Sequence, residues 1–174
     1  MHLKPGFAFL AATIFVLGCK NPLRKAPVVP VDAPISDSCE VLTSAEISAV
    51  LGIPIDPGSH SLVGSKILCN WSETGVTGDH AEKLALHFIS TDAFNGEKIP
   101  AGDIQVTPAP GIGDDAIYVT TRFDLSLLLR KGNTAVGFSF VNQTMSRDEI
   151  MSKEKALGLD AAARLQPAPV VRGK

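Results

Sequence analysis

Two segments near opposite ends of the chain have the hydrophobic periodicity of amphipathic α-helices. In residues 43–51, apolar side chains recur on one face, and Thr43 and Glu46 have the spacing of a capping box. Gly52 follows as a residue type that commonly ends a helix. Residues 146–165 begin with the same capping signal and keep an apolar stripe. The pattern therefore predicts one helix near each end of the folded region.

Between these helices, the alternation of apolar and polar residues predicts β-strands. A Lys-Gly-Asn turn at residues 131–133 joins two of the segments as a hairpin. A short helix is expected to open at Thr91, and residues 104–106 form a brief strand at most. The strand segments that we predict are 66–72, 82–90, 116–121, 124–130 and 134–142.

This order of elements, with strands joined by hairpins and helices at both ends, predicts the α+β class. We expect an antiparallel β-sheet of about five strands, with the N-terminal and C-terminal helices packed on one face. The chain has 174 residues, 45% of them hydrophobic and 20% charged, which suits one domain with a real core. We assign that single domain to residues 39–166.

The first 18 residues have the proportions of a signal peptide. Lys4 precedes an apolar run that is shorter than the roughly 20 residues of a membrane-spanning helix. The run ends in Val-Leu-Gly-Cys at residues 16–19, which resembles the lipobox of bacterial lipoproteins. This resemblance implies that Cys19 is lipidated and becomes the first residue of the mature chain. The alternative, a buried apolar helix that ends in Cys by chance, is disfavoured because nothing in the run is amphipathic.

Residues 19–38 carry four prolines and are predicted to be a Pro-rich tether behind the lipid. Residues 167–174 are predicted to be a loose tail. We expect an exported protein anchored in a membrane by its acyl chains. That membrane is the outer membrane if the host is Gram-negative, because Lys20 stands where inner-membrane lipoproteins resemble one another in carrying Asp. Otherwise it is the outer face of the cell membrane.

The chain has three cysteines, an odd number that is awkward in an oxidising compartment. If Cys19 carries lipid, Cys39 and Cys69 remain as a pair, and we predict a disulfide between them. The alternatives are a free buried thiol and a metal ligand. Zinc is disfavoured because there are only two thiols and no Cys-x-x-Cys spacing.

Two short motifs carry a further resemblance. Residues 39–46 (Cys-Glu-Val-Leu-Thr-Ser-Ala-Glu) and 69–71 (Cys-Asn-Trp) resemble a group of small uncharacterised bacterial lipoproteins, many of them from actinobacteria. Those proteins share a Cys-x-Leu-Leu-Thr-x-x-Glu opening and a second Cys beside an aromatic residue. Residues 111–116 are similar to another recurrent piece of the group. The resemblance spans residues 39–165 and implies a lipid-anchored extracytoplasmic α+β domain, with no catalytic residues to carry over.

The candidate sites for chemistry are few. In the segment from Gly111 to Asp115, two carboxylates could hold calcium and two glycines could cradle an anion. However, the calcium ligands are too few and the glycines do not open a helix, so a turn is the better explanation. We expect Trp71 to pack against the disulfide. The three histidines lack zinc-site spacing and are expected to be solvated: His60 and His80 in loops, and His87 on the polar side of a strand.

We therefore expect no metal, no cofactor and no catalytic residue, and a non-enzymatic binding or accessory domain of the cell envelope. With a net charge of −2, the chain lacks a basic field for nucleic acid, so its expected partners are the membrane and an envelope protein. The alternative is an extracytoplasmic hydrolase whose residues meet only in the fold. A concave pocket with His87 or Asp114 beside a nucleophile would favour that alternative. A structural accessory protein would instead expose a large apolar patch.

Overall fold

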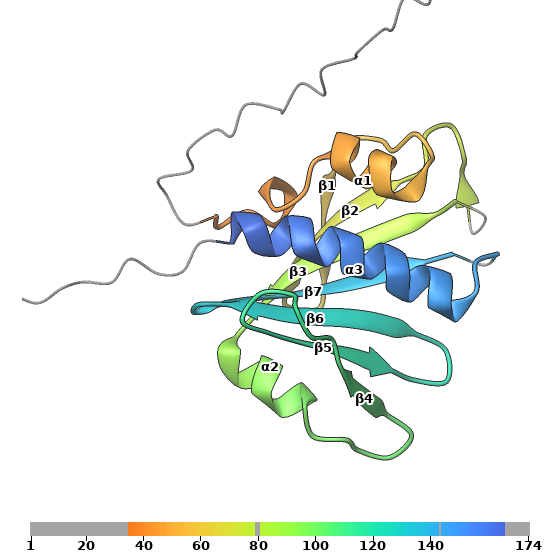
Figure 1. Ribbon diagram of the computed structural model, residues 1–174. Helices are drawn as coiled ribbons and strands as arrows, with labels where there is room; N and C mark the ends of the chain where they lie inside the picture. The colour runs from red at the N-terminus through yellow and green to blue at the C-terminus, as the bar shows by residue number, and fades with distance from the viewer. Residues whose placement is uncertain (1–34, 79–80, 143, 166–174) are drawn as a thin grey trace, which may run out of the picture. The chain divides into compact units, whose positions relative to one another are not determined.

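A computed structural model describes residues 35–78, 81–142 and 144–165 of the chain (Figure 1). The elements in chain order are η1 (Ser38–Glu40), α1 (Ser44–Leu51), β1 (Ser59–Val63), β2 (Lys66–Ser72), β3 (Lys83–Ile89), α2 (Thr91–Glu97), β4 (Gln105–Pro108), β5 (Asp115–Thr120), β6 (Leu125–Lys131), β7 (Thr134–Val141) and α3 (Arg147–Arg164). The predicted signal peptide, tether residues 19–34 and tail residues 167–174 lie outside the described residues. Cys19 lies there too, so its lipidation stays a prediction.

All the strands belong to one antiparallel sheet in the order β1-β2-β3-β7-β6-β5-β4. Two meanders, β1–β3 and β4–β7, are joined through the antiparallel pair of β3 and β7. The expectation of about five strands is therefore wrong, because the sheet has seven. The α+β class holds.

The two additional strands are the two edges of the sheet. All five residues of β1 are exposed, so β1 shows no alternation between buried and exposed positions that a sequence pattern could report. β4 has only four residues and ends in Pro108, a residue that suits an edge because it cannot donate to a neighbouring strand. Both strands are held mainly by backbone pairing to their inner neighbours.

The helices form a layer on each face of the sheet, and the two layers are unequal. α1 and α3 lie together on one face (Figure 1), where the main core contains Ile47 of α1, Leu157 of α3 and Phe138 of β7. α2 packs on the opposite face, where Phe94 is fully buried against Leu128 in a smaller apolar cluster. The larger layer thus covers the centre of the sheet but does not extend to its β1 edge.

The local signals at the helix starts form as predicted. Thr43 accepts a hydrogen bond from the N–H of Glu46, whose carboxylate accepts one in return. Ser146 and Glu149 form the same reciprocal pair at the start of α3. Each capping box satisfies backbone donors that a helix start otherwise leaves free. None of the helices among the described residues is long and apolar enough to span a membrane.

Candidate ligand-binding groove

An apolar groove of about 610 Å³ opens at the β1 edge of the sheet. Its apolar lining consists of Leu62, Ile67 and Phe88. Its polar lining consists of Asp37, His60 and the serines at positions 36, 38 and 61. The volume falls in the range of about 300 to 1,000 Å³ that is typical of small-molecule sites.

Strand register places the three apolar side chains side by side. Leu62 of β1 lies directly opposite Ile67 of β2. Phe88 of β3 is on the same face as Leu84 and Leu86, because side chains alternate along a strand. That face is the one that α1 and α3 cover, yet Leu62 and Ile67 stay 71% and 62% exposed. The helix layer therefore stops short of this corner of the sheet.

The residues that precede and begin η1 form the opposite wall. Asp37 is the N-cap of η1, and its carboxylate accepts a hydrogen bond of 2.8 Å from the N–H of Cys39. The same carboxylate oxygen lies 2.8 Å from Nε2 of His60 on β1. The Cys39 N–H, and after it His60, hold the pKa of Asp37 below its usual range. The groove thus ends in a carboxylate that stays charged.

A disulfide lies beside the contact between Asp37 and His60. Cys39 and Cys69 are joined, with their Cα atoms 5.0 Å apart, which confirms the predicted bridge. His60 lies directly opposite Cys69 in the β1–β2 register. The disulfide therefore ties the η1 wall of the groove to its floor on β2.

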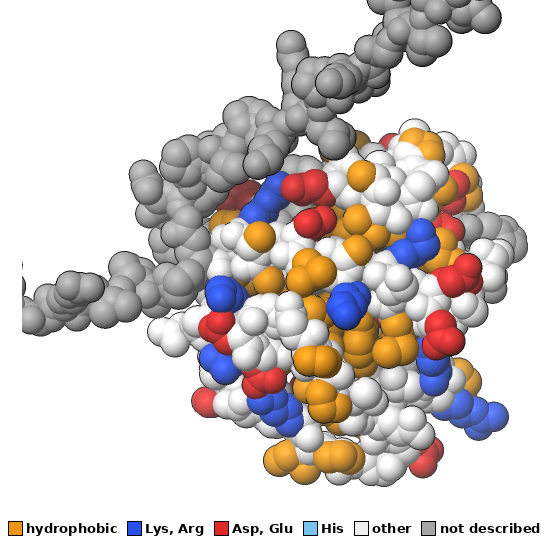
Figure 2. All heavy atoms as spheres, viewed as in Figure 1, with side chains coloured by type: hydrophobic (Ala, Val, Ile, Leu, Met, Phe, Trp, Pro, Cys, Tyr) orange, Lys and Arg blue, Asp and Glu red, His pale blue; other side chains and the backbone are white. Residues whose placement is uncertain are grey.

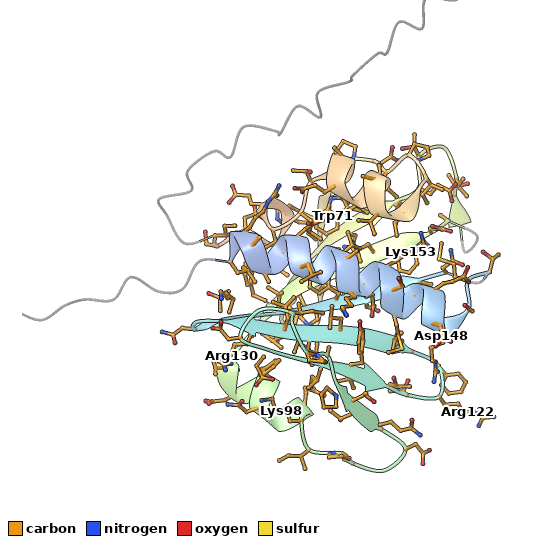
Figure 3. All side chains as sticks on the ribbon, in the orientation of Figure 1. Trp71, Lys98, Arg122, Arg130, Asp148 and Lys153 are labelled. Atoms are coloured by element: carbon orange, nitrogen blue, oxygen red, sulfur yellow. A yellow bond between two sulfur atoms is a disulfide. The ribbon has the colours of Figure 1, made fainter. Side chains whose placement is uncertain are left out.

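Trp71 lies buried beneath α1 on β2 (Figure 3), two residues from Cys69. The indole and the sulfur of Cys69 share one neighbour, Gly58. A Cβ on that glycine would lie 2.7 Å from Nε1 of Trp71 and 2.6 Å from the Cys69 sulfur. Gly58 is thus the residue that lets the chain pass over both groups at the start of β1.

The segment from Gly111 to Asp115 forms a turn that leads into β5, and both carboxylates are paired. Asp114 accepts hydrogen bonds from the ammonium of Lys131 at 2.8 Å and from the N–H of Gly132 at 2.7 Å. Lys131, with Gly132 next, holds the pKa of Asp114 below its usual range. Asp115 pairs with Lys98, and the Arg130 guanidinium lies 4.0 Å away; Lys98 and Arg130 are labelled in Figure 3. These pairs connect the segment to the end of α2, to β6 and to the β6–β7 turn.

His87 lies on the face of the sheet that is opposite the groove. It is half-buried between Leu68 of β2 and Gly137 of β7, its register partners. Burial lowers the pKa of His87, and the charge of Lys66 acts in the same direction. No hydroxyl nucleophile in the described part of the chain is hydrogen-bonded to His87. His80 lies outside the described residues.

Asp37 and His60 were not predicted as a pair, and the expectation that His60 lies in a loop is wrong. They are 23 residues apart and meet only because β1 adds to the sheet edge. The signals that could have found β1 are the glycines on either side of it, Gly58 and Gly64, which bracket a short β-hairpin. Ser36, Asp37 and Ser38, assigned to the tether, belong to the groove wall.

Acidic and basic side chains are interspersed on the face of the molecule that α3 covers, with apolar side chains between them (Figure 2).

Comparison with known proteins gives no match: no protein-family model, no curated protein and no solved structure is significantly similar to the chain. The resemblance to small bacterial lipoproteins therefore rests on the short motifs described above and stays a prediction.

Proposed function

We propose that this chain is a lipid-anchored cell-envelope protein whose folded domain binds a small amphipathic molecule in the groove. The observation that carries the proposal is the groove itself, where apolar side chains stay exposed beside a charged carboxylate. Leu62, Ile67 and Phe88 would bury the apolar body of the ligand. Asp37 would pair with a cationic end.

The proposed anchor is supported by the apolar run and lipobox-like motif that end at Cys19. Residues 36–38 line the groove and directly follow the Pro-rich segment. A ligand site would thus include the residues that directly follow the predicted tether in the sequence. The proposal of export and membrane attachment rests on the sequence motif, and the proposal of ligand binding rests on the groove.

The test is calorimetric titration of the full chain in detergent-free buffer with dodecylamine, below the concentration at which it forms micelles. Leu62→Ser removes apolar contact area and should weaken binding roughly tenfold. Ile99→Ser is the matched control, because Ile99 is equally exposed, at 71%, and lies outside the groove. Dodecyl sulfate, which has an anionic head, should bind more weakly than dodecylamine.

Binding that neither serine variant weakens would place the amphiphile elsewhere on the chain, for example on the apolar N-terminal run, and would contradict the proposal. Absence of dodecylamine binding to the wild-type chain would contradict the proposal outright. The lipid anchor is tested separately by mass spectrometry of wild type and Cys19→Ala. Acyl mass on the wild type alone supports it, and its absence from both refutes it.

A second candidate function, a hydrolase, is favoured by one observation. The Asp37–His60 pair lies in the groove together with Ser36, so an acid, a base and a hydroxyl line the same cavity. However, no hydrogen bond joins His60 to a serine hydroxyl among the described residues. Hydrolysis of a p-nitrophenyl ester that is lost in both His60→Ala and Ser36→Ala would favour this second function over the first.

A further inference from the structure

Three groups that can bind a metal ion meet at one end of the groove, and a fourth is bonded to one of them. Asp37, Cys39 and His60 each place one ligand atom within 4.8 Å of the other two. Cys69 lies outside this set of three, but its sulfur is bonded to that of Cys39, so reduction of the bridge would free a second thiol next to the set. With that thiol the groups are two sulfurs, one imidazole and one carboxylate, which together match the four-coordinate sites that zinc prefers.

The backbone fixes the positions of all four groups. Asp37 and Cys39 are held by the N-cap hydrogen bond of η1. His60 and Cys69 are direct partners in the β1–β2 ladder. The cluster therefore joins three separate elements, and it does not depend on a flexible loop to bring its ligands together.

Access and burial also suit a metal site. The side chains of His60 and Asp37 are 51% and 39% exposed, so an ion can reach them from the groove. Cys69 is fully buried beside the Trp71 indole. Thiolates and imidazole select zinc over calcium and magnesium, which take oxygen ligands.

We propose that reduction of the Cys39–Cys69 disulfide converts this cluster into a four-coordinate zinc site formed by Cys39, Cys69, His60 and Asp37. A dithiol reductant supplies two electrons and two protons: its own thiols become a disulfide, the protein S–S bond breaks, and each sulfur becomes a thiol. Zinc binding then releases both thiol protons, because the ligands are thiolates. The disulfide and the zinc site are mutually exclusive states of one cluster.

A structural disulfide alone needs neither an imidazole nor a carboxylate beside it. Here the imidazole stands opposite one cysteine, and the carboxylate accepts a hydrogen bond from the backbone N–H of the other. This hydrogen bond would also orient Asp37 as a ligand, as outer contacts orient metal ligands elsewhere. The sequence spacing hides the site, since the ligands come from positions 37, 39, 60 and 69.

The experiment uses the full chain with Cys19→Ala, so that only two thiols remain. The chain is reduced with a phosphine, freed of reductant without oxygen, and titrated with Co²⁺ and then Zn²⁺. We expect one equivalent of Co²⁺ to bind with a thiolate-to-metal charge-transfer band and the d–d bands of tetrahedral cobalt, and Zn²⁺ to displace it. The oxidised chain should show neither band.

Variants separate this site from adventitious binding by two thiols. His60→Ala and Asp37→Ala should each weaken Zn²⁺ binding roughly tenfold or more, and Cys39→Ser should abolish the charge-transfer band. His87→Ala is the matched histidine control and should bind Zn²⁺ as the wild type does. Leu62→Ser should also leave Zn²⁺ affinity unchanged, so failure of the groove ligand and failure of the zinc site are distinguishable.

The proposal is overturned if reduced wild type gives no charge-transfer band, or if His60→Ala and Asp37→Ala bind Zn²⁺ as tightly as the wild type. Circular dichroism of the reduced chain shows whether reduction unfolds the protein. Recovery of the native spectrum on adding Zn²⁺ would support the site, because metal binding is then coupled to folding. An unfolded chain that Zn²⁺ does not restore would overturn it.

Discussion

The ammonium group of Lys153, on α3, lies 3.0 Å from the carbonyl oxygen of Leu51, the last residue of α1. It also donates to the carbonyl oxygen of Val50 at 3.1 Å. Figure 3 shows Lys153 on the side of α3 that faces α1. The carbonyls at a helix C-terminus lack intrahelical partners and carry partial negative charge, so a cation from a neighbouring helix satisfies both deficits.

Replacing Lys153 with Met should therefore destabilise the protein by about 1 to 3 kcal/mol, since two charged hydrogen bonds at a helix end are lost while the apolar stem is kept. Urea denaturation at neutral pH measures the change. Lys155→Met is the matched control, because Lys155 is exposed on the same helix. Equal unfolding midpoints for the two variants would show that the α1–α3 contact does not depend on this lysine.

Gly58→Ala should destabilise the protein by about 1 to 3 kcal/mol through overpacking. The new Cβ would lie 2.6 Å from the sulfur of Cys69 and 2.7 Å from Nε1 of Trp71, and both groups are buried. Gly96→Ala is the control, because nothing lies within 4 Å of its added Cβ and it stands inside a helix. That variant should be neutral or slightly stabilising. A Gly58→Ala protein as stable as wild type would contradict the close packing.

The parts of the fold that follow from local chemistry were predictable from the sequence. Both capping boxes form, and the two strands predicted as a hairpin pair with each other, with Leu127 opposite Phe138 and Leu129 opposite Val136. Each of these features is encoded within a few residues or by the alternation of a strand with one buried face. Such signals do not depend on where the rest of the chain lies.

The candidate site was not predictable, because it depends on how distant parts of the chain lie relative to one another and not on local signals. β1 has no buried side chain, so its sequence carries no alternation, and only its backbone pairing with β2 makes it a strand. Without β1, His60 has no fixed position and Asp37 has no side-chain partner. The Cys39–Cys69 bridge was predictable by a different route, from the number of cysteines in an exported chain, and it is the one part of the site that the sequence identified.

Loss of the disulfide should lower the free energy of unfolding by about 3 to 4 kcal/mol. The bridge closes a loop between residues 30 positions apart, and cross-linking restricts the unfolded chain by about that amount. The measurement compares urea denaturation of oxidised chain with that of the double variant Cys39→Ala/Cys69→Ala. In a Cys19→Ala background, two reactive thiols in the denatured, unreduced protein would contradict the bridge.

Glu154, on α3, should make the protein less stable as the pH rises. Its side chain is 0% exposed, and neither carboxyl oxygen has a hydrogen-bond partner among the described residues. Burial, with the charge of Asp124 as a second cause, raises the pKa of Glu154 to about 9. In the unfolded chain the group titrates near 4.5. The folded state therefore holds a proton that the unfolded state releases between these two pH values.

A carboxyl whose pKa is higher in the folded state contributes its full stability below the unfolded pKa and loses it as the pH approaches the folded pKa. Glu154→Gln has no such titration, so its stability relative to wild type should rise with pH between about 5 and 9, by about 1 kcal/mol per pH unit at most. Urea denaturation at several pH values measures the difference. Glu97→Gln, at an exposed position of α2, should follow the wild-type profile. Parallel pH profiles for wild type and Glu154→Gln would mean that Glu154 is ionised in the folded protein, with a counter-charge or water satisfying it.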